Sequence, residues 1–192
     1  PERLGLTVNG ESAHRRVLFI QKMIFHYRLG FYNALAVLPG YSVTVAHSGP
    51  RVTRAGDSAG FREVILPESE WKGLRCQGHL RAEIDAADTV VALFDVHYLS
   101  SIYWSLVRPQ RVRWIWWGIG FGKSRAANRL RVWLANRDCR VALYMPDNLA
   151  DFRKAAVPVR KLFCVPNTIE VRTRAFQGDP ERRTSLLFLG SL

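Results

Sequence analysis

The sequence is poor in acidic residues, cysteine and methionine. It has 16 Asp and Glu against 28 Lys and Arg, a net charge of +12, three cysteines and two methionines among 192 residues. The cysteines, Cys76, Cys139 and Cys164, are odd in number and far apart, which argues against a disulfide framework and favours a reducing compartment. No signal-peptide pattern occurs in the polar, charged residues 1–16. Because 48% of the residues are hydrophobic, the chain can still bury the core of a soluble, cytoplasmic domain.

The sequence also lacks a purely apolar stretch of membrane-spanning length. Residues 89–107 come closest, but Asp95 and His97 lie near the centre of this stretch. A central Asp costs about 2.5–3.5 kcal/mol on insertion into a bilayer. We therefore expect a buried strand at 90–94 that turns into a helix at 99–107.

What the chain does have is a regular alternation of short apolar runs and helix-like segments. We predict strands at 17–20, 42–46, 64–66, 90–94, 112–117, 140–144 and 162–165. We predict helices at 29–38, 71–87 and 99–107, and two more that begin near Ser124 and Asp147. This alternation predicts an α/β fold, a Rossmann-like parallel sheet with helices on both faces. The runs at 17–20, 90–94 and 112–117 are the most continuously apolar, so we expect them side by side in the interior of the sheet.

Positive charge is concentrated between Arg108 and Arg140. Nine basic residues lie there with one acid, Asp138, and with four of the six tryptophans. Tryptophan rings beside cations suit an anionic membrane surface, where each cation contributes about 1 kcal/mol. A solvated basic face over buried tryptophans explains the pattern equally well. No DNA- or RNA-binding motif accompanies the charge, so nucleic acid is not an expected partner.

One segment, Gly56-Asp57-Ser58-Ala59-Gly60, fits G-x-S-x-G, the nucleophile elbow of serine hydrolases. The elbow requires a strand immediately before the serine and a helix immediately after it. Here charged residues precede the motif, and the apolar run that follows it ends in Pro67. We therefore interpret residues 47–60 as a loop and keep a serine hydrolase as the weaker alternative.

A second segment, from Trp117 to Ser124, is close to a phosphate-binding P-loop. That loop requires G-x-x-x-x-G-K-(S/T), but Trp117 stands at the position of the first glycine. An NTPase is therefore disfavoured. The backbone N–H groups of this glycine turn, at the start of a predicted helix and next to Lys123, are still a candidate site for an anion.

Four segments resemble GT-B glycosyltransferases of family 4, in particular their lipopolysaccharide and exopolysaccharide members. Val165-Pro-Asn-Thr-Ile-Glu170 looks like the strand end that closes their N-terminal domain, and Leu187-Phe-Leu-Gly-Ser-Leu192 looks like the strand that opens their donor-binding domain. Trp117-Gly-Ile-Gly120 is similar to their W-G-(H/L)-G motif. The segment from Ile20-Gln21 through Tyr27-Arg28 resembles their I-Q…Y-R motif.

The resemblance implies a domain division. Residues 1–175 would be the N-terminal, acceptor-side Rossmann-like domain, and residues 176–192 a linker and the first strand of an otherwise absent donor-binding domain. Asn167 would lie at the hinge between the two domains. Since the donor would bind mainly to the second domain, we expect this chain alone to transfer no sugar.

The resemblance also implies a substrate site at the carboxyl ends of the strands, where parallel sheets bind ligands. The candidate substrate-binding residues are Gln21, Tyr27, Arg28, Gly118, Ile119, Gly120 and Lys123. Asp95 and His97 are the candidate general bases. Gly118 and Gly120 would let the backbone approach a ligand, because no Cβ intervenes. Many relatives have a histidine at the position of Ile119, so here this position would contribute backbone shape.

The implied activity is the transfer of a sugar from a nucleotide-sugar to a glycan or lipid-linked acceptor in cell-surface polysaccharide synthesis. It would take place in the cytoplasm or on the inner face of the plasma membrane. The nucleotide-sugar is a substrate, no other cofactor is implied, and no metal is implied because the sequence has no D-x-D motif. The alternative from another class is a non-catalytic Rossmann-like binding module.

Overall fold

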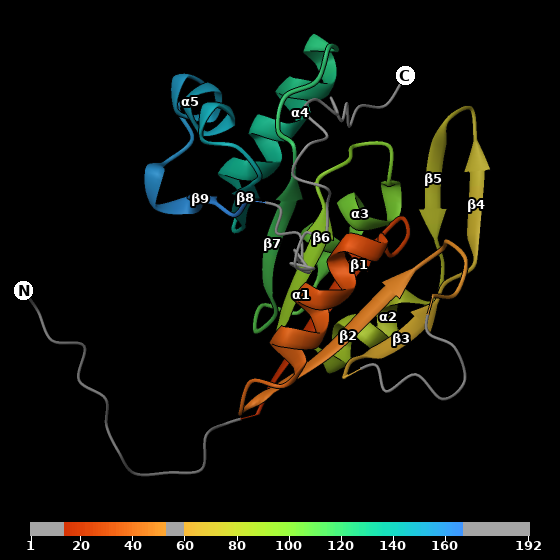
Figure 1. The fold of residues 1–192 in the computed structure, drawn as a ribbon. Coiled ribbons are helices and arrows are strands. Elements are labelled where there is room, and N and C mark those ends of the chain that lie inside the picture. Colours follow the sequence, from red (N-terminus) through yellow and green to blue (C-terminus); the bar gives the residue numbers. More distant parts are fainter. Residues whose placement is uncertain (1–13, 53–59, 167–192) are drawn as a thin grey trace, which may run out of the picture.

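All seven strands of the main sheet run parallel, as the computed structural model of the protein shows for residues 14–52 and 60–166 (Figure 1). The strands lie in the order β3-β2-β1-β6-β7-β8-β9. Their bounds are β1 Arg15–Gln21, β2 Tyr41–His47, β3 Arg62–Ile65, β6 Thr89–Leu93, β7 Arg113–Gly118, β8 Arg140–Leu143 and β9 Leu162–Cys164. The Rossmann-like α/β fold predicted from the sequence is therefore confirmed.

Helices cover both faces of this sheet. They are α1 His26–Ala36, α2 Leu80–Ala86, α3 Leu99–Val107, α4 Arg125–Asn136 and α5 Pro146–Lys154, with a short 3-10 helix at Val159–Lys161. Successive strand residues point to opposite faces, so Trp116 belongs to the core cluster that includes residues of α2, α4 and α5, while its neighbour Trp117 belongs to the cluster that includes residues of α1. None of the described helices combines the length and the apolar character needed to cross a membrane.

The centre of the sheet matches the sequence prediction. β1, β6 and β7 are adjacent, and each pairs in parallel register with the next. The strand order reverses between β1 and β6, since β1 is followed along the chain by β2 on its other side. Such a reversal leaves a crevice at the carboxyl ends of the strands, where ligands bind in open α/β sheets.

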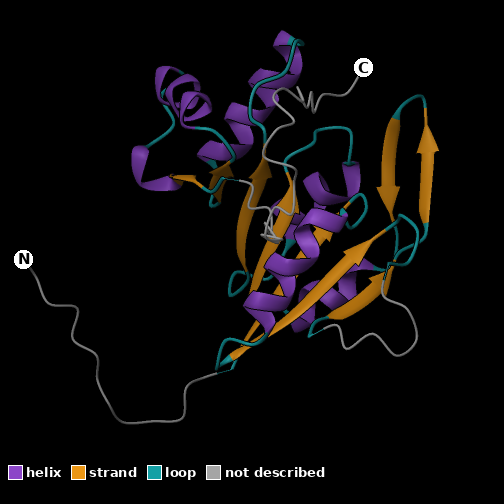
Figure 2. Ribbon diagram, in the orientation of Figure 1, coloured by secondary structure: helices purple, strands orange, loops and turns teal. Residues whose placement is uncertain are grey.

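The single helix predicted at 71–87 is wrong. This segment instead contains most of a hairpin, β4 Glu68–Trp71 and β5 Leu74–Gln77, followed by the short helix α2. The hairpin turns at Lys72 and Gly73, which both have positive φ angles, 48° and 79°. Two positive φ values match the tight type I′ turn, in which glycine is strongly favoured. The hairpin stands beside the main sheet, as Figure 2 shows.

The predicted hinge and second domain cannot be compared with the structure. Asn167 and residues 176–192 lie outside the described residues, as does the end of the predicted first domain. The last described strand, β9, pairs with β8, and Val165 donates its backbone N–H to the Leu143 carbonyl over 2.7 Å.

Arg16 and Asp88 join β1 to the residue that precedes β6. The backbone N–H of Arg16 donates to Asp88 Oδ2 over 2.8 Å, and Arg16 Nη2 donates to Oδ1 over 3.1 Å. These hydrogen bonds hold the pKa of Asp88 below its ordinary value of 3.8. The ionised carboxylate therefore stabilises the pairing at the centre of the sheet.

We expect Asp88→Asn to lower the free energy of unfolding at neutral pH by about 0.5–1 kcal/mol, as for a well-formed exposed ion pair. Because the pKa is depressed on folding, this stabilisation is present above the unfolded-state pKa of about 4 and is lost as the pH falls through the lower folded-state value. Urea unfolding at neutral pH and at about pH 2 measures both effects. Asp138→Asn is the control, since that side chain is fully exposed and has only a long ion pair, 3.7 Å, with Arg108. Equal losses in both variants would contradict the assignment.

Candidate functional site

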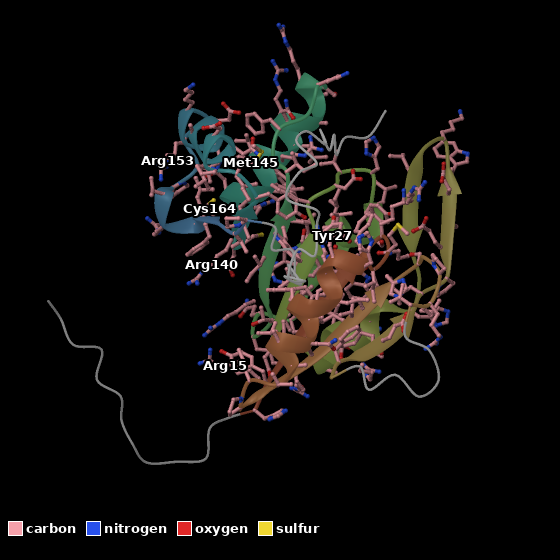
Figure 3. All side chains as sticks on the ribbon, in the orientation of Figure 1. Arg15, Tyr27, Arg140, Met145, Arg153 and Cys164 are labelled. Carbon is pink, nitrogen blue, oxygen red and sulfur yellow. The ribbon has the colours of Figure 1, made fainter. Side chains whose placement is uncertain are left out.

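A cavity of about 530 Å³ lies at the carboxyl ends of β1, β6, β7 and β8, within the size range of ligand pockets. Its lining residues are Lys22, Phe25, Tyr27, Arg28, Leu93, Phe94, Asp95, His97, Gly118, Ile119, Gly120, Phe121, Gly122, Arg131 and Tyr144. In Figure 3, Arg15 and Arg140 mark the amino ends of β1 and β8, and Tyr27 and Met145 lie beyond the carboxyl ends of these two strands. The cavity thus lies at the carboxyl ends of β1 and β6, the two strands between which the strand order reverses.

The structure brings most of the predicted site residues together in this cavity. Tyr27 and Arg28 come from the start of α1, Asp95 and His97 follow β6, and Gly118 to Gly120 end β7. This convergence follows from parallel pairing, because all the strands present their carboxyl ends at one edge.

Arg28 is the most buried charged residue of the site, with 5% of its surface exposed. Its Nη1 donates to Gln21 Oε1 over 2.7 Å, and its Nη2 donates to the Tyr144 hydroxyl. The guanidinium carbon lies 4.4 Å from the centre of the Trp117 ring, a cation–π contact worth about 2 kcal/mol when desolvated. Burial raises the pKa of Tyr144, so its hydroxyl is neutral at pH 7. The partners of Arg28 therefore fix the position of its guanidinium group but carry no negative charge that would neutralise it.

Gln21, a predicted substrate-binding residue, has a different place. Its side chain is buried and is not among the residues that line the cavity. It orients Arg28, and its carbonyl accepts a hydrogen bond over 2.8 Å from Gln77 Nε2 in the hairpin. Gln21 thus positions the guanidinium group of Arg28 and does not itself line the cavity.

Asp95 and His97 form a hydrogen-bonded pair at the rim of the cavity. His97 Nδ1 lies 2.7 Å from Asp95 Oδ1, and the His97 backbone N–H donates to the same oxygen over 3.0 Å. The hairpin supports this turn, because the backbone N–H of Arg75 donates to the His97 carbonyl over 2.7 Å. An aspartate on Nδ1 fixes the imidazole and leaves Nε2 as the nitrogen that can accept a proton from a substrate.

Gly118 and Gly120 are required for different reasons. A Cβ on Gly118 would lie 2.9 Å from Phe94 Cβ, so this glycine permits close packing between β7 and the end of β6. Gly120 has a φ of 105°, and a Cβ there would lie 3.1 Å from Asn148 Cβ. Between them, Ile119 is 69% exposed. The missing Cβ at Gly118 therefore serves the packing against Phe94, and Gly118 itself lines the cavity.

In the near-P-loop at 117–124, the amide of Gly122 is already engaged within the loop. The side chain of Asn128 hydrogen-bonds both backbone groups of Gly122. Asn128 Oδ1 accepts from the Gly122 N–H over 2.9 Å, and Asn128 Nδ2 donates to the Gly122 carbonyl over 2.8 Å. Ser124 caps α4 by accepting from the Ala127 N–H over 3.3 Å. Lys123 is exposed and is not among the residues that line the cavity.

Eight lining residues were not among the predicted site residues: Lys22, Phe25, Leu93, Phe94, Phe121, Gly122, Arg131 and Tyr144. Lys22 and Tyr144 directly follow β1 and β8, so the rule that sites lie at carboxyl ends could have identified them. Arg131 lies in the middle of α4, and no motif marks it. Its Nη1 donates to Asn128 Oδ1 over 3.1 Å.

The tryptophans of the basic stretch mostly belong to the core. Trp114, Trp116 and Trp117 are buried, and only Trp133 of the four is exposed. The alternative of buried tryptophans beneath a basic surface therefore describes these three correctly. On α4, exposed Arg125 and Arg129 remain available to an anionic partner.

Neither a known protein-family model nor a curated protein sequence matches the chain. Within residues 14–52 and 60–166, no cluster of three or more His, Cys, Asp or Glu side chains is arranged to hold a metal ion. All three cysteines are free.

We expect Gly120→Ala to destabilise the fold more than Gly73→Ala does. Both glycines have positive φ angles, so each alanine incurs about 1 kcal/mol of backbone strain. Only Gly120 adds a collision, because nothing lies within 4 Å of a Cβ at Gly73. Thermal unfolding of the two variants measures the difference. Equal destabilisation of the two variants would mean that the Asn148 side chain moves away from the new Cβ at no cost in free energy.

Proposed function

We propose that this chain is the acceptor-side domain of an enzyme that transfers a sugar from a nucleotide-sugar to a glycan or lipid-linked acceptor. The observation that carries the proposal is the Asp95–His97 pair at the rim of the cavity. The resemblance of Trp117-Gly-Ile-Gly120 and Tyr27-Arg28 to GT-B motifs also supports it, since these segments border the same cavity. The donor would come from a second domain facing this edge of the sheet.

In this mechanism His97 is the general base. Its Nε2 takes the proton of the acceptor hydroxyl while the acceptor oxygen bonds to the anomeric carbon of the donor sugar. The bond from that carbon to the nucleotide diphosphate breaks, and the diphosphate leaves with the bonding electron pair. Asp95 accepts the Nδ1–H hydrogen bond and stabilises the imidazolium that forms.

We expect His97→Ala to lower kcat for sugar transfer by about 10²–10⁴-fold in the protein that contains both domains, because a general base contributes about that much. Asp95→Asn should reduce kcat less, since the base stays in place. Release of nucleoside diphosphate in the presence of acceptor measures the rate.

His26→Ala is the matched control, as this exposed histidine does not line the cavity. Transfer at the native rate by the His97→Ala enzyme would exclude this residue as the base. Acceptor binding without transfer, even with both domains present, would favour the non-catalytic binding module.

The serine hydrolase alternative has less support. Ser58 lies outside the described residues, but β3 begins at Arg62, close to where the elbow requires a helix. We expect Ser58→Ala to change the hydrolysis of an activated ester such as p-nitrophenyl acetate by less than about twofold, within the range of a surface substitution. Loss of a measurable esterase activity in this variant would restore the hydrolase.

An anionic membrane surface is a compatible partner for the proposed enzyme. Arg125 and Arg129 on α4 are exposed, and Trp133 on the same helix is exposed as well. A location on the inner face of the plasma membrane would bring a lipid-linked acceptor to the site. Arg131 is excluded from such a docking face, because it is half-buried and lines the cavity.

A further inference from the structure

The charge of Arg28 is buried without a counter-charge. The side chains that contact it, Gln21, Tyr144 and Tyr32, are neutral, since burial raises the pKa of both tyrosines, that of Tyr32 to about 12. Its Nε is buried and makes no hydrogen bond of good geometry. No ion pair joins Arg28 to a carboxylate among the residues that the structure describes. A buried ion costs several kcal/mol of desolvation, which an opposite charge ordinarily offsets. The cation–π contact with Trp117 offsets only part of this cost.

A second arginine reaches the same cavity from the other face of the sheet. Arg131 comes from α4, whereas Arg28 comes from α1. The Nε of Arg131 is also buried without a hydrogen-bond partner. Burial lowers the pKa of Arg131, and the nearby charge of Asp95 acts in the opposite direction. Two guanidinium groups therefore border one cavity. Each has five N–H groups, and the hydrogen bonds described above use two of them in Arg28 and one in Arg131.

The cavity as a whole is electropositive. Its lining includes three cations, Lys22, Arg28 and Arg131, and one carboxylate, Asp95. The lining thus has an excess of two positive charges when His97 is neutral. A phosphate monoester carries about −1.5 to −2 at pH 7 and has three acceptor oxygens, so it matches this excess.

We propose that the acceptor carries a phosphoryl group and that this group binds between Arg28 and Arg131, with Lys22 at the rim of the cavity. The phosphoryl oxygens accept from the remaining Nη N–H groups of the two arginines and supply the missing counter-charge. The phosphate belongs either to a soluble sugar phosphate or to a lipid-linked sugar. The anion site stands without the proposed function, whereas its assignment to the acceptor rests on that function.

The test is a titration of the 192-residue chain with inorganic phosphate. Trp117 stacks on Arg28, so the NMR signals of the Trp117 indole N–H and of the Arg28 Nε–H both report on the site. We expect saturable binding that weakens about tenfold or more in Arg131→Gln, as for the loss of a charge-assisted contact. Arg28→Lys should also weaken binding, since a point charge does not replace the planar group.

Arg113→Gln is the matched control. It removes the same charge from an exposed residue at the start of β7, far along the strand from Gly118. If Arg28→Lys unfolds the chain, as judged by circular dichroism, Arg131→Gln and Lys22→Gln still decide the matter. The anion site is wrong if Arg131→Gln and Arg113→Gln weaken phosphate binding equally, because the binding would then reflect only the net charge.

Three ligand comparisons complete the test. Acetate that binds as tightly as phosphate would overturn the assignment of a phosphoryl group. Tighter binding of glucose 6-phosphate than of phosphatidic acid vesicles identifies a soluble sugar phosphate, and the reverse identifies a lipid-linked one. Binding of either ligand that is unchanged in Arg131→Gln would contradict the site.

Failure of the anion site and failure of the proposed function are distinguishable. If the native chain binds phosphate but the two-domain protein transfers no sugar, the anion site is supported and the proposed function is wrong. If the two-domain protein transfers sugar to an uncharged glycan but the chain binds no phosphate, the proposed function is supported and the anion site is wrong.

Discussion

The parallel pairing of β1 with β6 is the constraint on which the rest of the structure depends. The chain leaves β1 toward β2 on one side and returns, after the hairpin and α2, to β6 on the other side. Right-handed connections in opposite directions place α1 on one face and α2 to α5 on the other. The segments that leave β1 and β6 therefore diverge, and the cavity lies between them. The hydrogen bonds between Arg16 and Asp88 hold the opposite end of this pair.

The aromatic side chains of β7 connect the core to the site. Trp116 faces α5 and stacks on Phe94 with ring centres 5.2 Å apart, whereas Trp117 faces α1 and underlies Arg28. Gly118 then allows Phe94 to approach β7 closely. Of these residues, Phe94, Gly118 and Arg28 line the cavity, and the two tryptophans pack against them. Three of the four tryptophans that suggested a membrane surface in the sequence thus belong to the core beneath the pocket, and Trp133 is exposed.

The sequence allowed the main sheet to be predicted because its strands are buried on both faces and are continuously apolar. It did not reveal the β4–β5 hairpin, which is largely exposed and depends on the Lys72-Gly73 turn rather than on apolar periodicity. Tyr27, Arg28, Asp95 and His97 were predictable because they follow strand ends. Arg131 was not predictable, since only the docking of α4 brings this mid-helix residue to the cavity. Gln21 was assigned to the right region, but its role is to hold Arg28.

The hairpin and the arginines together account for how this site differs from a dinucleotide-binding Rossmann site. There, a glycine-rich turn after the first strand presents backbone N–H groups to the phosphates. Here the residues after β1 are Lys22-Met-Ile-Phe25, which contain no glycine, and the Gly122 amide is occupied by Asn128. Side-chain cations, Lys22, Arg28 and Arg131, therefore supply the charged donors of this cavity. Gln77 of the hairpin fixes Gln21, which in turn orients Arg28. The guanidinium is therefore held in place before any ligand arrives, and little ordering entropy is lost on binding.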